Sequence, residues 1–504
     1  MNIFFVPLDE RPCNWKYIKM MTHKHNHVKV EMVDQAVLGM QKKHADQDAL
    51  NQCIKSRVNY VDALVLSLDT FFYGGLIPSR IHSLSREVIN KQIDRLCSYK
   101  LKNPKLKIYA SICIMRSPTY NSSAEEPDYY AVYGRALHRK AYLQDKASRD
   151  VLNESEQCEL DAISIPSEIL KEYEGRRIFN QSVNEEVLQL VKEGIIDFLV
   201  IPQDDAAPYG YTALTQRVIT SKIAALELEN DVNIYPGADE VGSTLVTRAY
   251  VDYYAMRPKI YAFYASTLGP AIIPLYEDRP MLETLKYHVR ACGASLVQRA
   301  EEADFILAIN APGKVMQRAK EQHHNLDVSY TSYRNLNDFV LRIKSYLEDG
   351  YPLAVCDSAF GNGGDVSLIK RLDASHLLDT LLSYAGWNTN ANTLGTVLAD
   401  AILHFDQSVS DKKHLLHRYL EDVVYQSIVR QEVLAEVLPA LGCEDYHLEK
   451  KMSQVCCAVQ ERLEKVYRTL HLSEKYNVQL TSVSLPWKRL FEVDFEFNMQ
   501  EKVV

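Results

Sequence analysis

The chain has 504 residues, with 57 Lys or Arg against 66 Asp or Glu, so its formal net charge is −9. Its 47% hydrophobic and 24% charged residues are typical of a globular protein of two or three domains. This composition excludes collagen-like, disordered and small disulfide-stapled proteins. An acidic chain without a strong basic run also argues against nucleic acid or an anionic membrane as the main partner.

Cysteine usage and the first residues indicate the compartment. The ten cysteines are scattered and none forms a C-x-x-C pair, which is typical of reduced thiols rather than a disulfide framework or zinc site. The opening MNIFFVPLDERP lacks the basic region and cleavage site of a signal peptide, and no apolar stretch is long enough to span a membrane. We expect a cytoplasmic protein without a cofactor or metal. The oligomeric state stays open, with a homodimer as one option.

In the first half of the chain, short apolar runs alternate with helical patterns, as in parallel α/β folds. Most of these runs end in polar or turn residues, and ligand sites of such folds lie at the carboxyl ends of the strands. We therefore expect residues 1–255 to form a barrel-like parallel (β/α) catalytic domain. The predicted strands are 2–6, 28–32, 63–68, 107–114, 197–202 and 232–235.

A second α/β pattern begins near residue 256. It predicts a smaller Rossmann-like domain over residues 256–405, although some of its strands could instead complete a barrel begun in the first half. Residues 406–504 are predicted to be a helical region with a strand-like tail. The strands predicted for the second pattern are 259–265, 294–297, 305–309, 353–356 and 381–384.

The pair Asp204-Asp205 follows the apolar run FLVIP. Where a strand ends and the chain turns, both carboxylates can face one cleft, and crowding then raises the pKa of one of them. Such a pair supplies an acid and a base near neutral pH. The alternative is that one aspartate caps the next helix or closes a turn before Pro208.

A second acidic pair, Asp239-Glu240, follows VNIYPGA and lies between Gly237 and Gly242. It is a further catalytic candidate. A helix N-terminus, where acidic residues complement the helix dipole, explains it equally well.

Other strand ends carry residues suited to hydroxyl-rich ligands. Arginine, tyrosine, tryptophan and asparagine side chains offer hydrogen bonds or flat faces to sugars. The two glycines of YGG suggest a tight turn whose amides could meet a ligand. The alternatives are a structural ion pair between Asp9 and Arg11, tyrosines packed on loop surfaces, and an Asn- and Gly-rich turn. The predicted substrate-binding residues are Asp9, Arg11, Asp69, Tyr73, Arg80, Arg116, Tyr120, Trp387 and Asn388.

Six motifs in order resemble a bacterial family catalogued as domain of unknown function 4127: PLDERPCN, LDTFFYGGLIPSR, RSPTY with EEPDYY, PQDDAAPYG, PGADEVG and AGWNTNANTLG. The resemblance covers nearly the whole chain and implies motif positions rather than a reaction. Asp204 and Asp205 are also similar, more weakly, to the consecutive aspartates of barrel N-acetylglucosaminidases. That likeness implies that Asp204 orients the acetamido group and that Asp205 is the general acid.

The leading hypothesis is a hexosaminidase-like glycoside hydrolase that acts on a small sugar or N-acetylamino-sugar conjugate. Asp205 would protonate the leaving oxygen, and Asp204 would orient the acetamido group or act as the partner base. In an ordinary two-carboxylate mechanism Asp239 or Glu240 would supply the second group.

Two other hypotheses stay open. The first is a divalent-metal hydrolase or isomerase with Asp9, Asp69, Asp204 and Asp239 as oxygen ligands. The second is a non-catalytic sugar-binding protein built from two α/β domains around a cleft.

Overall fold

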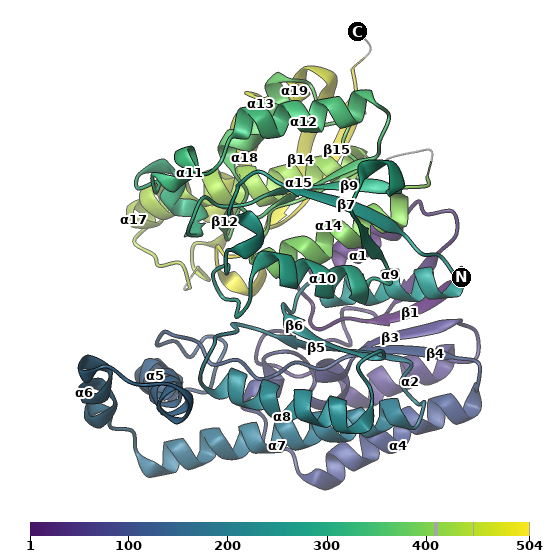
Figure 1. Cartoon of the computed structure of the whole chain (residues 1–504), viewed down its shortest axis with the longest axis vertical. Helices are drawn as coiled ribbons and strands as arrows, with labels where there is room; N and C mark the ends of the chain where they lie inside the picture. Colours follow the sequence, from purple (N-terminus) through teal and green to yellow (C-terminus); the bar gives the residue numbers. More distant parts are fainter. Residues whose placement is uncertain (408–411, 447, 503–504) are drawn as a thin grey trace. The chain divides into compact units, whose positions relative to one another are not determined.

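A computed structural model describes residues 1–407, 412–446 and 448–502 (Figure 1). These residues form two compact units. Unit 1 comprises Met1–Glu10, His27–Tyr253 and Tyr276–Asp278. Unit 2 comprises Arg11–Asn26, Tyr254–Leu275 and the described residues of Arg279–Val504.

Unit 1 contains a six-stranded sheet in the order β2-β1-β3-β4-β5-β6, with every neighbouring pair parallel. Strands β3 and β5 are buried along their whole length, which explains their continuous apolar sequences. The strands are β1 (Asn2–Val6), β2 (Lys29–Met32), β3 (Ala63–Ser67), β4 (Lys107–Ser111), β5 (Phe198–Gln203) and β6 (Val232–Pro236).

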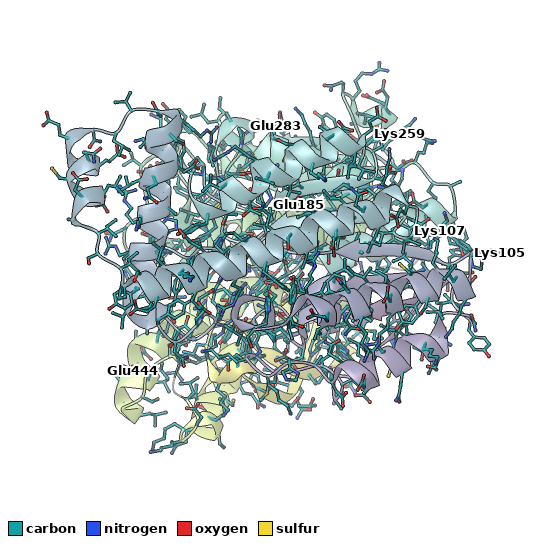
Figure 2. All side chains as sticks on the ribbon, turned by 90° about the horizontal axis from the view of Figure 1, so that it is seen from below. Lys105, Lys107, Glu185, Lys259, Glu283 and Glu444 are labelled. Carbon is teal, nitrogen blue, oxygen red and sulfur yellow. The ribbon has the colours of Figure 1, made fainter. Side chains whose placement is uncertain are left out.

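Helices cover both faces of this sheet. Figure 1 shows α4, α7 and α8 along one face and α9 on the other. Lys105 and Lys107 lie where β4 begins (Figure 2), at the opposite end of that strand from Arg116. The helices of unit 1 are α2 (Gln47–Arg57), the π-helix η1 (Asp69–Tyr73), α3 (Pro78–Ile81), α4 (Arg86–Lys102), α5 (Tyr130–Arg149), α6 (Glu154–Ala162), α7 (Ser167–Lys192), α8 (Tyr211–Leu226) and α9 (Val241–Tyr253).

The predicted α/β class with parallel sheets is confirmed, but the barrel-like form of the first domain is not. Within the described chain, β2 and β6 are the two edges of an open sheet and do not pair with each other. Closure into a barrel requires the first and last strands to bond. Here the second strand in the chain occupies one edge instead, because the connection after it returns past β1 to β3.

Unit 2 contains a five-stranded parallel sheet in the order β13-β11-β9-β7-β8, with α12 and α13 on one face and α10 and α14 on the other (Figure 1). Its strands are β7 (Lys259–Tyr264), β8 (Ser295–Val297), β9 (Phe305–Asn310), β11 (Leu353–Asp357) and β13 (Ser383–Ala385). The first helices of the unit are α1 (Lys16–Thr22), η2 (Gly269–Ala271), α10 (Met281–Ala291), η3 (Ala300–Glu302), η4 (Ala319–His323), α11 (Ser329–Ser332), α12 (Leu336–Glu348), α13 (Val366–Ala374) and α14 (Asn390–His404).

The C-terminal part of the chain is helical, as predicted, and shares one hydrophobic core with the sheet of unit 2. That core joins Ile306 and Val355 of the sheet to Val423, Val459 and Phe495. The elements of this part are α15 (Lys412–Arg418), the π-helix η5 (Tyr419–Val429), α16 (Arg430–Glu432), η6 (Val433–Val437), α17 (Leu438–Leu441), α18 (Met452–Tyr467), α19 (Leu472–Lys475) and η7 (Pro486–Lys488), with the antiparallel pair β14 (Tyr476–Ser484) and β15 (Asp494–Glu501). Two short strands, β10 (Gln317–Arg318) and β12 (Phe360–Gly361), pair separately.

Helix α1, from the beginning of the chain, packs in unit 2. Lys16 Nζ lies 2.7 Å from Asp494 Oδ1. The Tyr17 hydroxyl donates to the Glu421 carboxylate, and its ring lies 3.7 Å from the Arg418 guanidinium. These contacts join the first and last parts of the sequence within one unit.

No helix in the described part of the chain is both long and apolar enough to cross a membrane.

We expect Leu307→Ala to lower the free energy of unfolding by about 2–5 kcal/mol, because Leu307 is fully buried in the middle of β9. Urea unfolding of the variant measures this loss. Leu341→Ala, at a position that is 65% exposed on α12, is the matched control and should change stability by less than about 1 kcal/mol. Equal losses in the two variants would contradict the central place of β9 in the core.

Candidate active site

The chain order of unit 1 has a switch point between the neighbouring strands β1 and β3. The connection after β1 leads to β2 on one side, and the connection after β3 leads to β4 on the other. Ligands of open α/β sheets bind at such a switch point, outside the carboxyl ends of the strands. Asp9 and Asp69 follow the two strands there, and both are buried. The Thr70 hydroxyl lies 2.7 Å from the Pro7 carbonyl oxygen and 2.8 Å from that of Leu8, so it ties the two loops together.

Asp69 links β3 to the next strand. Its Oδ2 accepts a hydrogen bond from the Cys113 backbone N–H at 3.0 Å. Burial raises the pKa of the Asp69 carboxyl to about 6, and the Cys113 amide and the Arg80 charge limit that rise. Asp69 is therefore a buried carboxyl with a pKa well above the ordinary aspartate value of 3.8.

The Tyr73-Gly74-Gly75 turn closes the π-helix that starts at Asp69. The Gly74 N–H donates to the Thr70 carbonyl oxygen, and the Gly75 N–H donates to the Asp69 carbonyl oxygen. These amides therefore form hydrogen bonds within the turn and are not available to a ligand. Gly74 has φ 93°, and a Cβ there would meet the backbone of Ala45 at 2.9 Å, which explains the glycine. The Tyr73 ring stacks on His82, with ring centroids 4.6 Å apart.

Arg80 is almost completely buried and is held by the short helix α3. Its Nη2 donates to Asp204 Oδ2 at 2.7 Å, and its Nη1 lies 3.2 Å from Glu125 Oε2 and 3.4 Å from Glu126 Oε1. Arg176 Nη1 donates to the Arg80 carbonyl oxygen at 3.0 Å. One guanidinium therefore joins three carboxylates that are distant in the sequence.

Arg116, in the segment that follows β4, carries the second guanidinium of the cluster. Its Nε donates to Glu126 Oε1 at 2.8 Å and its Nη2 to Glu125 Oε2 at 2.8 Å. The backbone next to it is fixed by Arg177, whose Nη1 donates to the Arg116 carbonyl oxygen at 2.9 Å and whose Nη2 donates to that of Met115 at 2.7 Å. Arg116 is thus positioned through both its backbone and its side chain.

Asp204 and Asp205 approach the same nitrogen of Arg116. Asp204 Oδ2 lies 3.6 Å and Asp205 Oδ2 lies 3.4 Å from Nη1. Asp205 has φ 50°, in the left-handed region, so the chain turns sharply as it leaves β5. Neither aspartate caps the next helix, because α8 begins at Tyr211 with Gly210 as its N-cap. The helix-cap alternative for this pair is therefore wrong.

The two aspartates differ in charge environment. Burial, together with the neighbouring Asp204 carboxylate, raises the pKa of Asp205 to about 7, although Arg116 and Arg80 counteract the rise. Asp204 is the partner that Arg80 contacts at 2.7 Å. Their side chains are 25% and 23% exposed, so both reach the surface of the cluster. The pair combines a carboxyl whose pKa lies near 7 with one that forms ion pairs with arginine.

Asp239 and Glu240 are buried at the end of the adjacent strand β6, directly before α9. Glu240 Oε2 accepts from the Ala238 N–H at 3.0 Å, and the Glu240 carbonyl oxygen accepts from the Thr244 N–H. These bonds belong to the start of a helix. The ion pairs described above connect Arg80 and Arg116 to Asp204 and Asp205 rather than to this second acidic pair.

The remaining predicted substrate-binding residues fall in different places. Tyr120 lies in unit 1 and is 48% exposed. Arg11 belongs to unit 2, where it lies 3.2 Å from Glu492 Oε1 and stacks on Trp487 at 4.6 Å. Trp387 also belongs to unit 2 and is buried edge-on against Tyr17. In the same unit the Asn388 carbonyl accepts from the Asn362 N–H at 2.7 Å.

Glu125 and Glu126 are not among the site residues predicted from the sequence. Glu126 is 1% exposed, and its Oε2 has no hydrogen-bond partner among the described residues. The signal that could have found these residues is the EEP sequence that begins nine residues after Arg116, because two adjacent acidic residues close to an arginine after a strand can form ion pairs with it.

In the described part of the chain, no group of three or more His, Cys, Asp or Glu side chains is arranged to hold a metal ion.

We expect Arg80→Met to lower the free energy of unfolding by about 3–5 kcal/mol, because it leaves Asp204, Glu125 and Glu126 without one of their two guanidiniums. Chemical denaturation measures the loss. The control is Arg139→Met, which removes a more exposed ion pair with Glu159 and should cost about 0–1 kcal/mol. Equal costs would show that the cluster does not depend on Arg80.

We expect Asp205→Asn to stabilise the protein more at about pH 8 than at about pH 5, by on the order of 2 kcal/mol. The folded wild type keeps a proton on Asp205 up to about pH 7, whereas the unfolded chain releases it near the ordinary value of 3.8. Wild-type stability therefore falls as pH rises through this window, and asparagine removes that fall. Denaturation at both pH values tests this. The exposed Asp161→Asn is the control and should show no such difference.

Comparison with known proteins gives a family but no activity. No curated protein matches the sequence. One similar solved structure is the carboxyl transferase domain from Rhizobium etli pyruvate carboxylase with 3-bromopyruvate, at 10% identity and a TM-score of 0.20. The likeness covers 94% of this chain and 61% of that chain, and a TM-score this low carries no argument. The family model described as "Protein of unknown function (DUF4127)" matches residues 3–496. The chain therefore belongs to the DUF4127 family.

Proposed function

We propose that unit 1 carries a glycoside hydrolase site that acts on a small sugar or an N-acetylamino-sugar conjugate. The observation that carries the proposal is the pairing of Asp205, whose pKa is raised to about 7, with Asp204, which Arg80 contacts at 2.7 Å. Glycoside hydrolysis requires a carboxylic acid that is still protonated near neutral pH and a second carboxylate close to it.

In the proposed reaction Asp205 donates its proton to the glycosidic oxygen as the bond from that oxygen to the anomeric carbon breaks. Water adds to the anomeric carbon, and its proton returns to the Asp205 carboxylate. The left-handed backbone at Asp205 supports this role, because backbone strain is common at reacting groups.

Asp204 is the favoured second group. On an N-acetylamino sugar it would orient the acetamido group, whose oxygen then attacks the anomeric carbon. On other sugars it would act as the partner base. Asp239 or Glu240 would take the second role only in an ordinary two-carboxylate mechanism. The hydrogen bond from the Ala238 amide to Glu240 makes that assignment less favourable.

The partly exposed groups of the cluster suit a hydroxyl-rich ligand. Asp204, Asp205 and Glu125 have side chains that are 25%, 23% and 16% exposed, and Tyr120 lies in the same segment as Glu125. Carboxylates accept hydrogen bonds from sugar hydroxyls, and a tyrosine ring packs on a sugar face. Arg80 and Arg116 keep these carboxylates in place.

We propose that the protein acts in the cytoplasm and that its binding partner is a small carbohydrate substrate. All ten cysteines are free, as a reducing compartment favours.

We expect Asp205→Asn to lower kcat/KM on glycosides with poor leaving groups by about 10²–10⁴-fold. On 2,4-dinitrophenyl glycosides, whose leaving group needs no protonation, the variant should lose far less. Rates on matched chromogenic glycosides, including N-acetylglucosaminides, measure both effects. Asp204→Asn should lose activity on both classes, because its role does not depend on the leaving group.

Asp161→Asn, on the surface of α6, is the control and should keep wild-type rates. The proposal fails if the wild type turns over no glycoside in the panel, or if Asp205→Asn leaves every rate unchanged. Tight sugar binding without turnover would instead support a binding protein. Activity that disappears on chelation and returns with a divalent cation would support a metal-dependent enzyme.

A further inference from the structure

Unit 2 contains an open polar groove with a volume of about 770 Å³ that belongs to neither acidic pair described above. Its walls come from the segment after β7, from α11 with the residues up to the start of α12, and from α13. Representative lining residues are Ser266, Thr267, Arg334, Arg342 and Arg371.

The groove lies where a ligand site is expected in an open α/β sheet. The connection after β7 leads to β8 on one side, and the connection after β9 leads to β11 on the other. The switch point of unit 2 is therefore at the carboxyl ends of β7 and β9. Ser266 and Thr267 follow β7 and line the groove, and Asn310 ends β9 directly behind Arg334.

The charge of the groove is opposite to that of the whole chain. Its lining includes three arginines and one aspartate, Asp338, and Arg334 is also ion-paired with Asp365, so one positive charge remains in a chain whose net charge is −9. Arg342 and Arg371 form no ion pair with a carboxylate among the described residues. Arginine presents a planar fork of donors that fits phosphate and carboxylate oxygens.

Arg334 is held in position from behind. It is 7% exposed, and its Nη1 donates to Asp365 Oδ2 at 2.7 Å and to Asn310 Oδ1 at 3.1 Å. Its Nε lies 3.4 Å from the Tyr330 carbonyl oxygen. Its Nη2 makes no hydrogen bond to any residue that the structure describes. A side chain fixed through two nitrogens loses little entropy when the third binds a ligand.

Arg371 shows the same arrangement on the other wall. Its Nε donates to Asn337 Oδ1 at 3.0 Å and its Nη1 donates to the Ser367 carbonyl oxygen at 3.0 Å, while its Nη2 has no hydrogen-bond partner in the described chain. Arg342 stacks on the Phe263 ring at 4.1 Å. The hydroxyls of Thr267 and Ser367 also have no hydrogen-bond partner among the described residues.

Two helices begin at the groove, but their first amides are already used. Asn335 accepts from the Asp338 N–H at the start of α12. Asp365 accepts from the Ser367 and Leu368 N–H groups at the start of α13. The available donors are therefore guanidinium nitrogens and hydroxyls.

We propose that this groove binds the phosphate group of a small phosphorylated ligand. Three guanidiniums and two hydroxyls around one cavity supply the number of donors that a phosphate takes, and Arg342 and Arg371 supply the positive charge. A single carboxylate has two oxygens and would leave more of these donors unused. The proposal concerns unit 2 and does not depend on the glycosidase assignment for unit 1.

The test is isothermal titration of the whole protein with inorganic pyrophosphate at constant ionic strength. We expect the wild type to bind one equivalent, and the double variant Arg342→Gln/Arg371→Gln to bind roughly tenfold or more weakly. The single variant Arg371→Gln changes only an exposed side chain, so we expect it to fold. It should also bind pyrophosphate more weakly than the wild type, and it therefore tests the proposal even if the double variant does not fold. Arg299→Gln, at a side chain of unit 2 that is 71% exposed, is the matched control and should bind like the wild type.

Three results of the pyrophosphate titrations would overturn the proposal. They are no pyrophosphate binding by the wild type, equal binding by the wild type and both groove variants, and an equal loss in Arg299→Gln. A parallel titration with malonate separates phosphate from carboxylate chemistry. Malonate binding as tight as that of pyrophosphate would overturn the phosphate assignment.

Discussion

Both larger sheets are parallel throughout, and parallel strands place all their carboxyl ends at one edge of the sheet. In unit 1 that edge collects Asp9, Asp69, Arg116 and Asp204 from the neighbouring strands β1, β3, β4 and β5. In unit 2 the same constraint brings Asn310 next to the loop that carries Arg334. The polar chemistry of each unit follows from the direction of its strands, because hydrophobic side chains fill both faces of each sheet and leave the strand ends for polar groups.

Buried charge at the edge of unit 1 requires compensation. Arg80 and Arg116 are both buried, and burying a guanidinium without an anion is costly, so each contacts several carboxylates. Arg80 and Arg116 carry two positive charges and form ion pairs with four carboxyl groups, those of Glu125, Glu126, Asp204 and Asp205. Two positive charges cannot balance four negative ones, and the pKa of Asp205 is raised to about 7. The raised pKa of Asp205 is thus a product of charge balance in the whole cluster, and it would not arise from the Asp-Asp sequence alone.

The strands were predictable because a buried parallel strand has a distinctive local sequence: the predicted 305–309 matches β9, Phe305–Asn310, nearly to the residue. Strand order is not local, so the open sheet of unit 1 could not be told from a barrel. The residues of the candidate site show the same difference between features that local sequence reveals and features that depend on distant parts of the chain. Arg116 and Asp204 directly follow apolar runs, so the sequence could select them as candidates, whereas Glu125 lies in a loop without periodicity. Arg11 was grouped with Asp9, but the chain passes from unit 1 to unit 2 between them.

The position of α1 has a consequence for how the protein folds. Residues 11–26 leave the ribosome early, yet their partners in unit 2 include Glu421 and Asp494, which are 404 and 478 residues further along the chain. Unit 1 can form most of its sheet once residue 253 has been synthesised, while α1 must wait for the last elements of unit 2. During that interval Tyr17 and Ile18, which end up buried, are exposed to solvent. Because these contacts join residues so far apart in the sequence, we expect the docking of α1 to be a late step in folding.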